Sequence, residues 1–281
     1  METARSGHQG SLKLNMDLVK ELLVQFLRDE TRNAGFSRGV IGVSGGVDSA
    51  VSAYLSVQAL GAENTVGIIM PYRTSSAESI RDAERVVKEL GMKSERIDIS
   101  PMVDAYCDKE KINDNLRRGN VMARVRMIVL YDISAREGAL VIGTSNKTEI
   151  MVGYGTLFGD TASALNPLGD LYKTQVWQLA GALGVPSAII EKKPTADLWA
   201  GQTDEGELGF SYDKLDELLF QMIDERRSDE ELVKIGFAAD FIRAVRSKVS
   251  TNQFKRRPPV IAKVSYRTLN VDFRYARDWG I

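Results

Sequence analysis

Short apolar runs alternate with helix-like stretches through the first half of the chain. In the stretches between the runs, apolar residues recur at the spacing of one helix face. The runs predict strands at 40–43, 66–70, 94–99 and 139–143, and the stretches predict helices at 16–34, from 48 onward, at 76–90 and at 114–137. Strands that alternate with helices in this way predict an α/β fold: a parallel sheet with helices on both faces and right-handed crossovers.

The second half of the chain continues as C-terminal helices with one long polar interruption. Helical spacing predicts helices at 174–184, 186–191, 212–225, 229–236 and 238–249. The interruption at 192–210 is rich in Gly, Asp, Glu and Thr, so it is either disordered or a mobile lid loop. We expect the start, 1–15, to be disordered, and the C-terminal tail, 250–281, to be extended and packed on the body. Residues 1–281 then form a single domain.

Composition excludes several classes of function. The 281 residues include 37 Lys+Arg and 38 Asp+Glu, and this balance argues against nucleic acid as a partner. The single cysteine, Cys107, excludes a disulfide framework, and the single histidine, His8, argues against histidine-based catalysis. No apolar run approaches membrane-spanning length and no signal-peptide pattern is present, so we expect a cytoplasmic protein with no membrane partner.

The clearest chemical signal lies where the first predicted strand meets its helix. The strand is followed by Ser44-Gly45-Gly46, which predicts a tight turn, and a helix begins near Asp48. The N–H groups of such a turn, with the positive end of a helix behind them, form a cradle for phosphate. The alternative is an ordinary βα turn capped by serine and aspartate. The candidate nucleotide-binding residues are Gly42, Val43, Ser44, Gly45, Gly46, Val47, Asp48 and Ser49.

Two other segments are expected at the same edge of the sheet. Met70 ends the second strand, and residues 144–149 follow the fourth. Ligands of parallel α/β sheets bind at this edge, which makes Met70 and Thr144 candidates for the nucleotide site. Asp48 and Glu149 could hold Mg²⁺ there, because magnesium prefers carboxylate and phosphate oxygens. The alternative for Glu149 is a helix-capping role, which spacing alone favours.

Several motifs resemble those of known enzymes. The run S-G-G-x-D-S-A at 44–50 resembles the pyrophosphatase loop of the N-type ATP pyrophosphatases. Further runs, in order along the chain, look like NAD synthetases: G-N-x-x-A-R-x-R-M (119–127), G-T-S-N-K-T-E (143–149), G-Y-G-T-L-F-G-D (153–160), N-P-L-G-D-L-Y-K-T-Q-V (166–176), P-T-A-D-L-W-x-G-Q-T-D-E-x-E-L-G-F-S-Y-D (194–213) and K-R-R-P-P (255–259).

This resemblance covers most of the chain and implies an adenine nucleotide alpha hydrolase-like fold. It implies a ligase for the last step of NAD biosynthesis, the amidation of deamido-NAD with ATP and ammonia. The nicotinate carboxylate would attack ATP to give an acyl-adenylate and pyrophosphate, and ammonia would then displace AMP. The implied partners are ATP, deamido-NAD, ammonia and Mg²⁺.

The resemblance also implies roles for single residues. Lys173 and Thr144 would contact ATP, and Thr195 would close on it from the lid loop. Asp48 and Glu149 would bind the metal ion. Lysine neutralises phosphate charge and arginine offers a planar fork to an anion, but both more often lie on solvated helix faces. The residues implied to contact deamido-NAD are Arg124 and Lys255. The catalytic candidates are Asp48, Lys173 and Asp204, the last as a base for incoming ammonium.

The chain departs from many NAD synthetases at three positions on the dinucleotide side. Leu157, Ala164 and Phe254 replace a lysine, an aspartate and a histidine. The chain is too short for the amidotransferase domain of glutamine-dependent relatives, so we expect direct use of ammonia or delivery by a separate glutaminase subunit. Family resemblance implies a homodimer, with the 114–137 helix either at its interface or packed in the core.

Two other functions remain open from the sequence. One is a different ligase of the same superfamily, such as a tRNA-modifying enzyme, which the near-zero net charge disfavours. The other is a non-catalytic ATP sensor, which would need the phosphate cradle but neither Glu149 nor Lys173.

Overall fold

A four-stranded parallel sheet forms the centre of the computed structural model, which describes residues 12–199 and 201–268. The strands are β1 (Arg38–Gly42), β2 (Thr65–Ile69), β3 (Lys93–Arg96) and β4 (Ala139–Ile142), in the order β3-β2-β1-β4. All three pairings are parallel, as the sequence predicted. The order places the carboxyl ends of β2, β1 and β4 side by side, and this edge carries the site.

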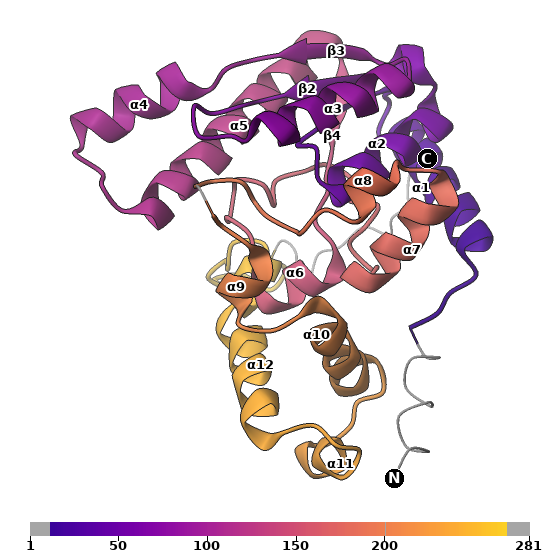
Figure 1. The fold of residues 1–281 in the computed structure, drawn as a ribbon, viewed down its shortest axis with the longest axis vertical. Coiled ribbons are helices and arrows are strands. Elements are labelled where there is room, and N and C mark those ends of the chain that lie inside the picture. The colour runs from indigo at the N-terminus through magenta and orange to yellow at the C-terminus, as the bar shows by residue number, and fades with distance from the viewer. Residues whose placement is uncertain (1–11, 200, 269–281) are drawn as a thin grey trace.

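Helices cover both faces of the sheet (Figure 1). Alternate side chains of β1 divide between the faces: Ile41 joins one hydrophobic cluster and Val40 the other. The first cluster holds side chains of α1 (Met16–Asn33), α2 (Val47–Leu60), α3 (Ala77–Glu89), α7 (Lys173–Leu183) and α8 (Ser187–Ile190). The second holds side chains of α4 (Ser100–Lys109) and α5 (Asn115–Glu137). Both faces of the sheet are therefore buried.

The C-terminal helices build a third cluster beside the sheet domain (Figure 1). They are α10 (Tyr212–Leu219), which continues into a π-helical turn (Phe220–Asp224), α11 (Asp229–Lys234) and α12 (Ala239–Thr251). Val152, the last residue of α6 (Lys147–Val152), and Tyr172, the residue before α7, belong to this cluster. The cluster therefore packs against the two segments that follow β4. The remaining short elements are η1 (Ala62–Asn64), α6 (Lys147–Val152), α9 (Asp204–Leu208) and η3 (Gln253–Arg256).

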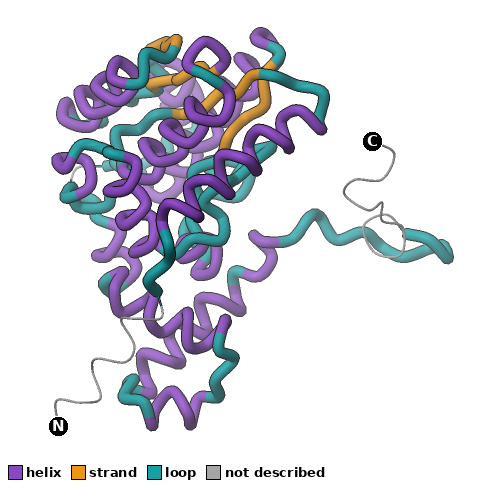
Figure 2. Tube along the Cα trace, turned by 90° about the vertical axis from the view of Figure 1, so that its right-hand side faces the viewer, coloured by secondary structure: helices purple, strands orange, loops and turns teal. Residues whose placement is uncertain are grey.

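The ends of the chain differ in part from expectation. Residues 1–11 and 269–281 lie outside the described residues, but Leu12 is buried in the third cluster and Asn15 caps α1. The tail was expected to be extended from residue 250, but α12 runs to Thr251 and η3 covers Gln253–Arg256. Beyond η3 the chain is extended, and Val260, Val264 and Tyr266 are almost fully exposed, so at these positions it does not pack on the body (Figure 2). Pro258 and Pro259 lack the N–H groups that would pair this segment with a neighbour.

Among the described residues, three α-helices and the short 3-10 helices η1 and η3 were not predicted. α4 was missed, and α6 and α9 are short helices in segments read as loop. The polar loop at 192–210 is therefore partly helical. In the described part of the chain, no helix is both long and apolar enough to cross a membrane.

Candidate active site

The loop between β1 and α2 has the shape of a phosphate cradle. Gly45 has φ +82°, and a Cβ there would meet the backbone oxygen of Ser79 at 2.1 Å, so only glycine fits. The Ser49 hydroxyl accepts from the Ser44 N–H at 3.1 Å and donates to the Gly46 carbonyl at 2.9 Å. Gly46, the residue before α2, has no side chain to cap the helix, so the first N–H groups of α2 are left for a ligand.

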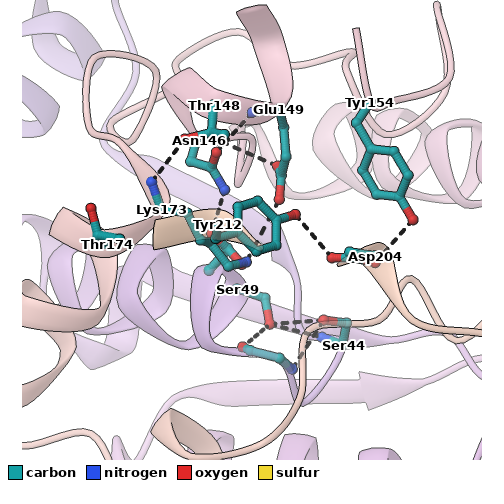
Figure 3. A network of polar contacts seen from close by, with 12 residues as sticks. Ser44, Ser49, Asn146, Thr148, Glu149, Tyr154, Lys173, Thr174, Asp204 and Tyr212 are labelled. Atoms are coloured by element: carbon teal, nitrogen blue, oxygen red, sulfur yellow. Dashed lines mark hydrogen bonds and ion pairs between the residues drawn. The ribbon is translucent and has the colours of Figure 1, made fainter. Parts of the chain in front are cut away.

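A buried lysine joins two carboxylates beside this loop (Figure 3). The Lys173 Nζ lies 2.5 Å from Asp48 Oδ2 and 3.7 Å from Glu149 Oε1. Burial alone would lower the pKa of Lys173, but the charges of Asp48 and Glu149 outweigh it and raise the pKa above its ordinary value. Asn146 Nδ2 donates to Asp48 Oδ1 at 2.9 Å and fixes this carboxylate. The lysine is therefore a fixed positive charge.

Glu149 combines the two roles that the sequence left open. Its Oε2 accepts from the Asn146 N–H at 3.3 Å, which completes a capping box at the start of α6. Its Oε1 faces Lys173. Burial, and then the nearby charge of Asp48, raise the pKa of Glu149 to about 8. Because the carboxylates of Asp48 and Glu149 repel each other, a further cation between them would be favourable. Their oxygens are therefore a suitable pair of ligands for Mg²⁺.

A buried hydrogen-bond network holds Lys173 in place. Asp216 on α10 accepts from the Thr148 hydroxyl at 2.5 Å and from the Thr174 N–H at 2.8 Å. The Thr148 hydroxyl in turn accepts from the Lys173 N–H at 3.0 Å. The third hydrophobic cluster thus orients the start of α7, where the lysine lies.

The polar loop at 192–210 brings Asp204 to the site. One oxygen of Asp204 accepts from the Tyr154 hydroxyl at 2.9 Å and the other from the Tyr212 hydroxyl at 3.2 Å (Figure 3). Burial raises the pKa of this carboxyl, although Lys173 and both hydroxyls act in the opposite direction. At the start of the loop, Lys192 Nζ pairs with Asp82 Oδ2 at 2.8 Å.

One cavity of about 560 Å³ contains most of the predicted site residues. Arg124 is exposed instead, and its Nη2 donates to the Leu157 carbonyl at 3.2 Å. Lys255 donates to the carbonyls of Gly153 and Gly155 at 2.7 and 2.8 Å. The predicted residues that line the cavity are Gly42, Val43, Ser44, Gly46, Val47, Asp48, Ser49, Met70, Thr144, Glu149, Lys173, Thr195, Asp204 and Lys255.

Sequence reasoning missed several residues of the cavity wall. Tyr154 lines it, and with Tyr212 it binds Asp204, while Asn146 orients Asp48. The contacts of Tyr154 with Asp204 and of Asn146 with Asp48 join segments 50 and 98 positions apart, which spacing along the chain does not reveal, although Asn146, Tyr154 and Tyr212 all lie in the motifs quoted above. Arg126 lines the cavity as well, and here a signal existed. It shares one face of α5 with the other lining residues of that helix, Leu116, Asn120, Ala123, Met127 and Leu130.

Comparisons with known proteins agree on one family. The family model described as NAD synthase matches residues 19–259. A protein of Trichlorobacter lovleyi named NH(3)-dependent NAD(+) synthetase is 57% identical over 269 residues, which are 96% of this chain and 98% of that protein. Among solved structures, an NH3-dependent NAD synthetase from Campylobacter jejuni in complex with the nitrate ion is 33% identical, with a TM-score of 0.78 over 89% of this chain and 100% of that chain. An NMN synthetase from Francisella tularensis is 31% identical, with a TM-score of 0.80 over 89% of this chain and 99% of that chain.

Proposed function

Because the chain belongs to the NAD synthase family, we infer that it catalyses the ATP-dependent amidation of deamido-NAD to NAD with ammonia. The observation that carries this inference is the near full-length match to NH3-dependent synthetases, together with a phosphate cradle that faces Lys173. The enzyme is a carbon–nitrogen ligase with ATP as co-substrate. Neither a tRNA-modifying ligase nor a non-catalytic ATP sensor has comparable support.

The first step joins two anions, so the protein must neutralise charge. The nicotinate carboxylate attacks the α-phosphorus of ATP, and pyrophosphate leaves. The N–H groups of the cradle hold phosphate oxygens, the hydroxyls of Ser44 and Ser49 fix the shape of the loop, and Lys173 supplies a positive charge that needs no reorganisation. Thr144 and Thr195 line the same cavity and complete the ATP site, while Met70 lies beside it.

Asp48 and Glu149 fit a magnesium ion. Both line the cavity beside the cradle, both present hard oxygen donors, and their mutual repulsion favours a cation. In the described part of the chain, no group of three or more acidic, histidine or cysteine side chains is placed to hold a metal ion, so substrate phosphates and water would complete the coordination. When bound, the ion would stabilise negative charge on the phosphates.

The second step needs a proton acceptor. Ammonia attacks the acyl carbon, AMP leaves, and the nitrogen sheds a proton. Asp204 is our candidate, because its burial raises its pKa and so makes it a better base than an exposed aspartate. Tyr154 and Tyr212 hold both of its oxygens in place. We place the 192–210 loop over the adenylate, where it excludes water.

The substrate that accepts the nitrogen is less firmly identified by the site residues than ATP is. Arg124 and Lys255 remain candidates for contact with deamido-NAD, but Leu157, Ala164 and Phe254 lack the polar groups of many relatives. A second candidate acceptor is nicotinate mononucleotide, because one similar structure is that of an NMN synthetase. Both acceptors carry the same reacting carboxylate.

Product analysis tests these assignments. Purified protein is incubated with ATP, Mg²⁺ and ammonium or glutamine, and with either deamido-NAD or nicotinate mononucleotide. We expect equal amounts of NAD and AMP from deamido-NAD with ammonium alone. Faster turnover of the mononucleotide would show that it is the preferred acceptor. Activity only with an added glutaminase would show that ammonia comes from a partner subunit. An absence of ATP cleavage would refute the proposed function.

Three further features belong to this proposal. Ammonia is used directly, in keeping with the names of the relatives, although a separate glutaminase subunit remains the alternative source. The enzyme works as a homodimer, which the exposed apolar side chains of α5 support. It acts in the cytoplasm, where ATP is supplied.

A further inference from the structure

Arg126 on α5 is a cation of the cavity wall that forms no ion pair with any described residue. Its Nε donates to the Met70 carbonyl at the end of β2, at 3.2 Å. Within residues 12–199 and 201–268, this is its only hydrogen bond, and no carboxylate pairs with its guanidinium. The two Nη nitrogens therefore have four N–H groups without a protein acceptor.

The two carboxylates that influence Arg126 are engaged elsewhere. Asp197 on the 192–210 loop accepts from the Ser76 N–H at 2.9 Å, and Asp160 accepts from the Thr156 N–H at 2.7 Å. Their charges act on Arg126 only from a distance, and burial prevails and lowers its pKa. Arg126 is half-buried, and a partly desolvated guanidinium without a paired anion is costly for a folded protein.

Three other cations of the same wall have partners, and a fourth, Lys193, is exposed to solvent. Lys173 pairs with Asp48, Lys192 pairs with Asp82, and Lys255 donates to two backbone carbonyls. The unpaired state of Arg126 is therefore not a general property of the cavity.

Arg118, two turns earlier on the same helix, provides the sharpest contrast. It donates to the Tyr72 hydroxyl at 3.0 Å and to the Ile112 carbonyl at 2.8 Å, and it lies 3.5 Å from Asp104. Its hydrogen bond with Tyr72 is the main cause of a raised pKa, whereas the pKa of Arg126 is lowered. Arg118 lies outside the cavity lining and has the contacts of a structural arginine.

We propose that Arg126 binds a phosphate oxyanion of the nucleotide substrates through its two Nη nitrogens. With Nε held by the Met70 carbonyl, the planar fork presents both Nη groups together, as bidentate phosphate binding requires. This role rests on the proposed function, since ATP and deamido-NAD both carry phosphates. The empty enzyme then keeps an unpaired charge whose energetic cost is recovered when the nucleotide binds.

Three variants test the role: Arg126→Gln, Arg126→Lys and the matched control Arg118→Gln. The melting temperature of each is measured without ligand, with ATP and with deamido-NAD, and KM and kcat follow from turnover. Arg126→Gln should melt no lower than the wild type when empty, and should lose most of its nucleotide-induced shift. Its KM for the bound nucleotide should rise roughly 10- to 100-fold, the range expected for lost hydrogen bonds to a charged group. Arg126→Lys should keep part of the shift.

The control should behave in the opposite way. Arg118→Gln should melt at a lower temperature when empty and keep the full nucleotide-induced shift. The nucleotide whose shift and KM change in Arg126→Gln identifies the source of the phosphate. An Arg126→Gln protein that melts lower or fails to fold, or that keeps both shifts, would overturn the proposal. A wild type that binds ATP but makes no NAD would refute the proposed function while leaving this binding test intact.

Discussion

Gly45 and Gly46 are neighbours in the phosphate loop, but they face different surroundings. A side chain at Gly45 would collide with the Ser79 carbonyl, and φ there is +82°. At Gly46 the nearest atom to a new Cβ is the Ser44 Oγ, at an ordinary 3.4 Å. Each glycine therefore supports the loop for a different reason: Gly45 for backbone geometry, and Gly46 for close approach to a ligand.

Alanine at these two positions should separate folding from binding. Gly45→Ala should lower the free energy of unfolding by roughly 2–4 kcal/mol, because strain and a backbone clash act together. Gly46→Ala should leave stability within about 1 kcal/mol and raise the KM for ATP, since the new methyl group stands between backbone and phosphate. Urea unfolding and ATP kinetics measure the two effects. A Gly45→Ala protein as stable as the wild type would contradict the loop geometry.

Asp216 makes stability depend on pH. Burial raises its pKa to about 6, so in the folded state it keeps a proton that the unfolded chain has already lost above about pH 4. Stability from this group is therefore fully present below about pH 4 and is lost as the pH rises toward 6. The size of the pKa shift corresponds to roughly 3 kcal/mol.

Asp216→Asn removes this titration while keeping the size of the side chain. Between pH 4 and 7, the wild type should lose roughly 2–3 kcal/mol more unfolding free energy than the variant, because only the wild type gives up a proton on unfolding. Urea unfolding at several pH values measures both proteins. Parallel pH profiles would show that Asp216 does not titrate in this range.

At the scale of elements, the 192–210 loop is attached to the sheet domain at its start and to the third hydrophobic cluster through α9. Lys192 Nζ pairs with Asp82 and donates to the Ser79 hydroxyl at 3.1 Å, and Asp204 on α9 accepts from two tyrosines. These attachments hold the loop over the cavity. Loosening one of them should admit water to the adenylate.

Lys192→Met tests the lid role, with Lys193→Met as the control. Lys193 is the exposed neighbour of Lys192 on the same loop. Lys192→Met should raise the ratio of AMP released to NAD formed, because water then competes with ammonia for the acyl carbon. Lys193→Met should keep the ratio near one. Equal ratios in the two variants would refute the lid role, as would unchanged coupling after deletion of the loop.

Sequence predicted the elements whose signal is local and long. The sheet strands and the longer helices have clear periodicity, and the Ser44–Ser49 loop has its glycine pair within one βα turn. α9, with five residues, is too short to show a helical period. α4 has Pro101 in its first turn and a weakly patterned sequence.

Contacts between distant segments cannot be predicted from local patterns: Lys173 and Asp48 are 125 positions apart. Arg126 was not predicted as a site residue because a charged residue on a helix is usually exposed to solvent.

At the scale of the whole molecule, α5 has apolar side chains that no other described residue covers. Leu116, Ile128 and Tyr131 on α5 are exposed, and Leu116 also lines the cavity. A second copy packed on this face would cover apolar side chains and stand next to the acceptor site. The α1 side chains Leu18 and Leu22 are equally apolar and exposed, but they lie away from the cavity.

Charged substitutions on α5 should therefore break the proposed homodimer and weaken acceptor binding. Ile128→Asp with Tyr131→Asp should sediment as a monomer at micromolar concentration, because burying two carboxylates in an apolar interface is strongly unfavourable. Its KM for deamido-NAD should rise while its KM for ATP stays near the wild-type value. The matched control, Leu18→Asp with Leu22→Asp, should remain a dimer. A monomeric wild type, or an α5 variant that stays dimeric, would move the interface away from α5.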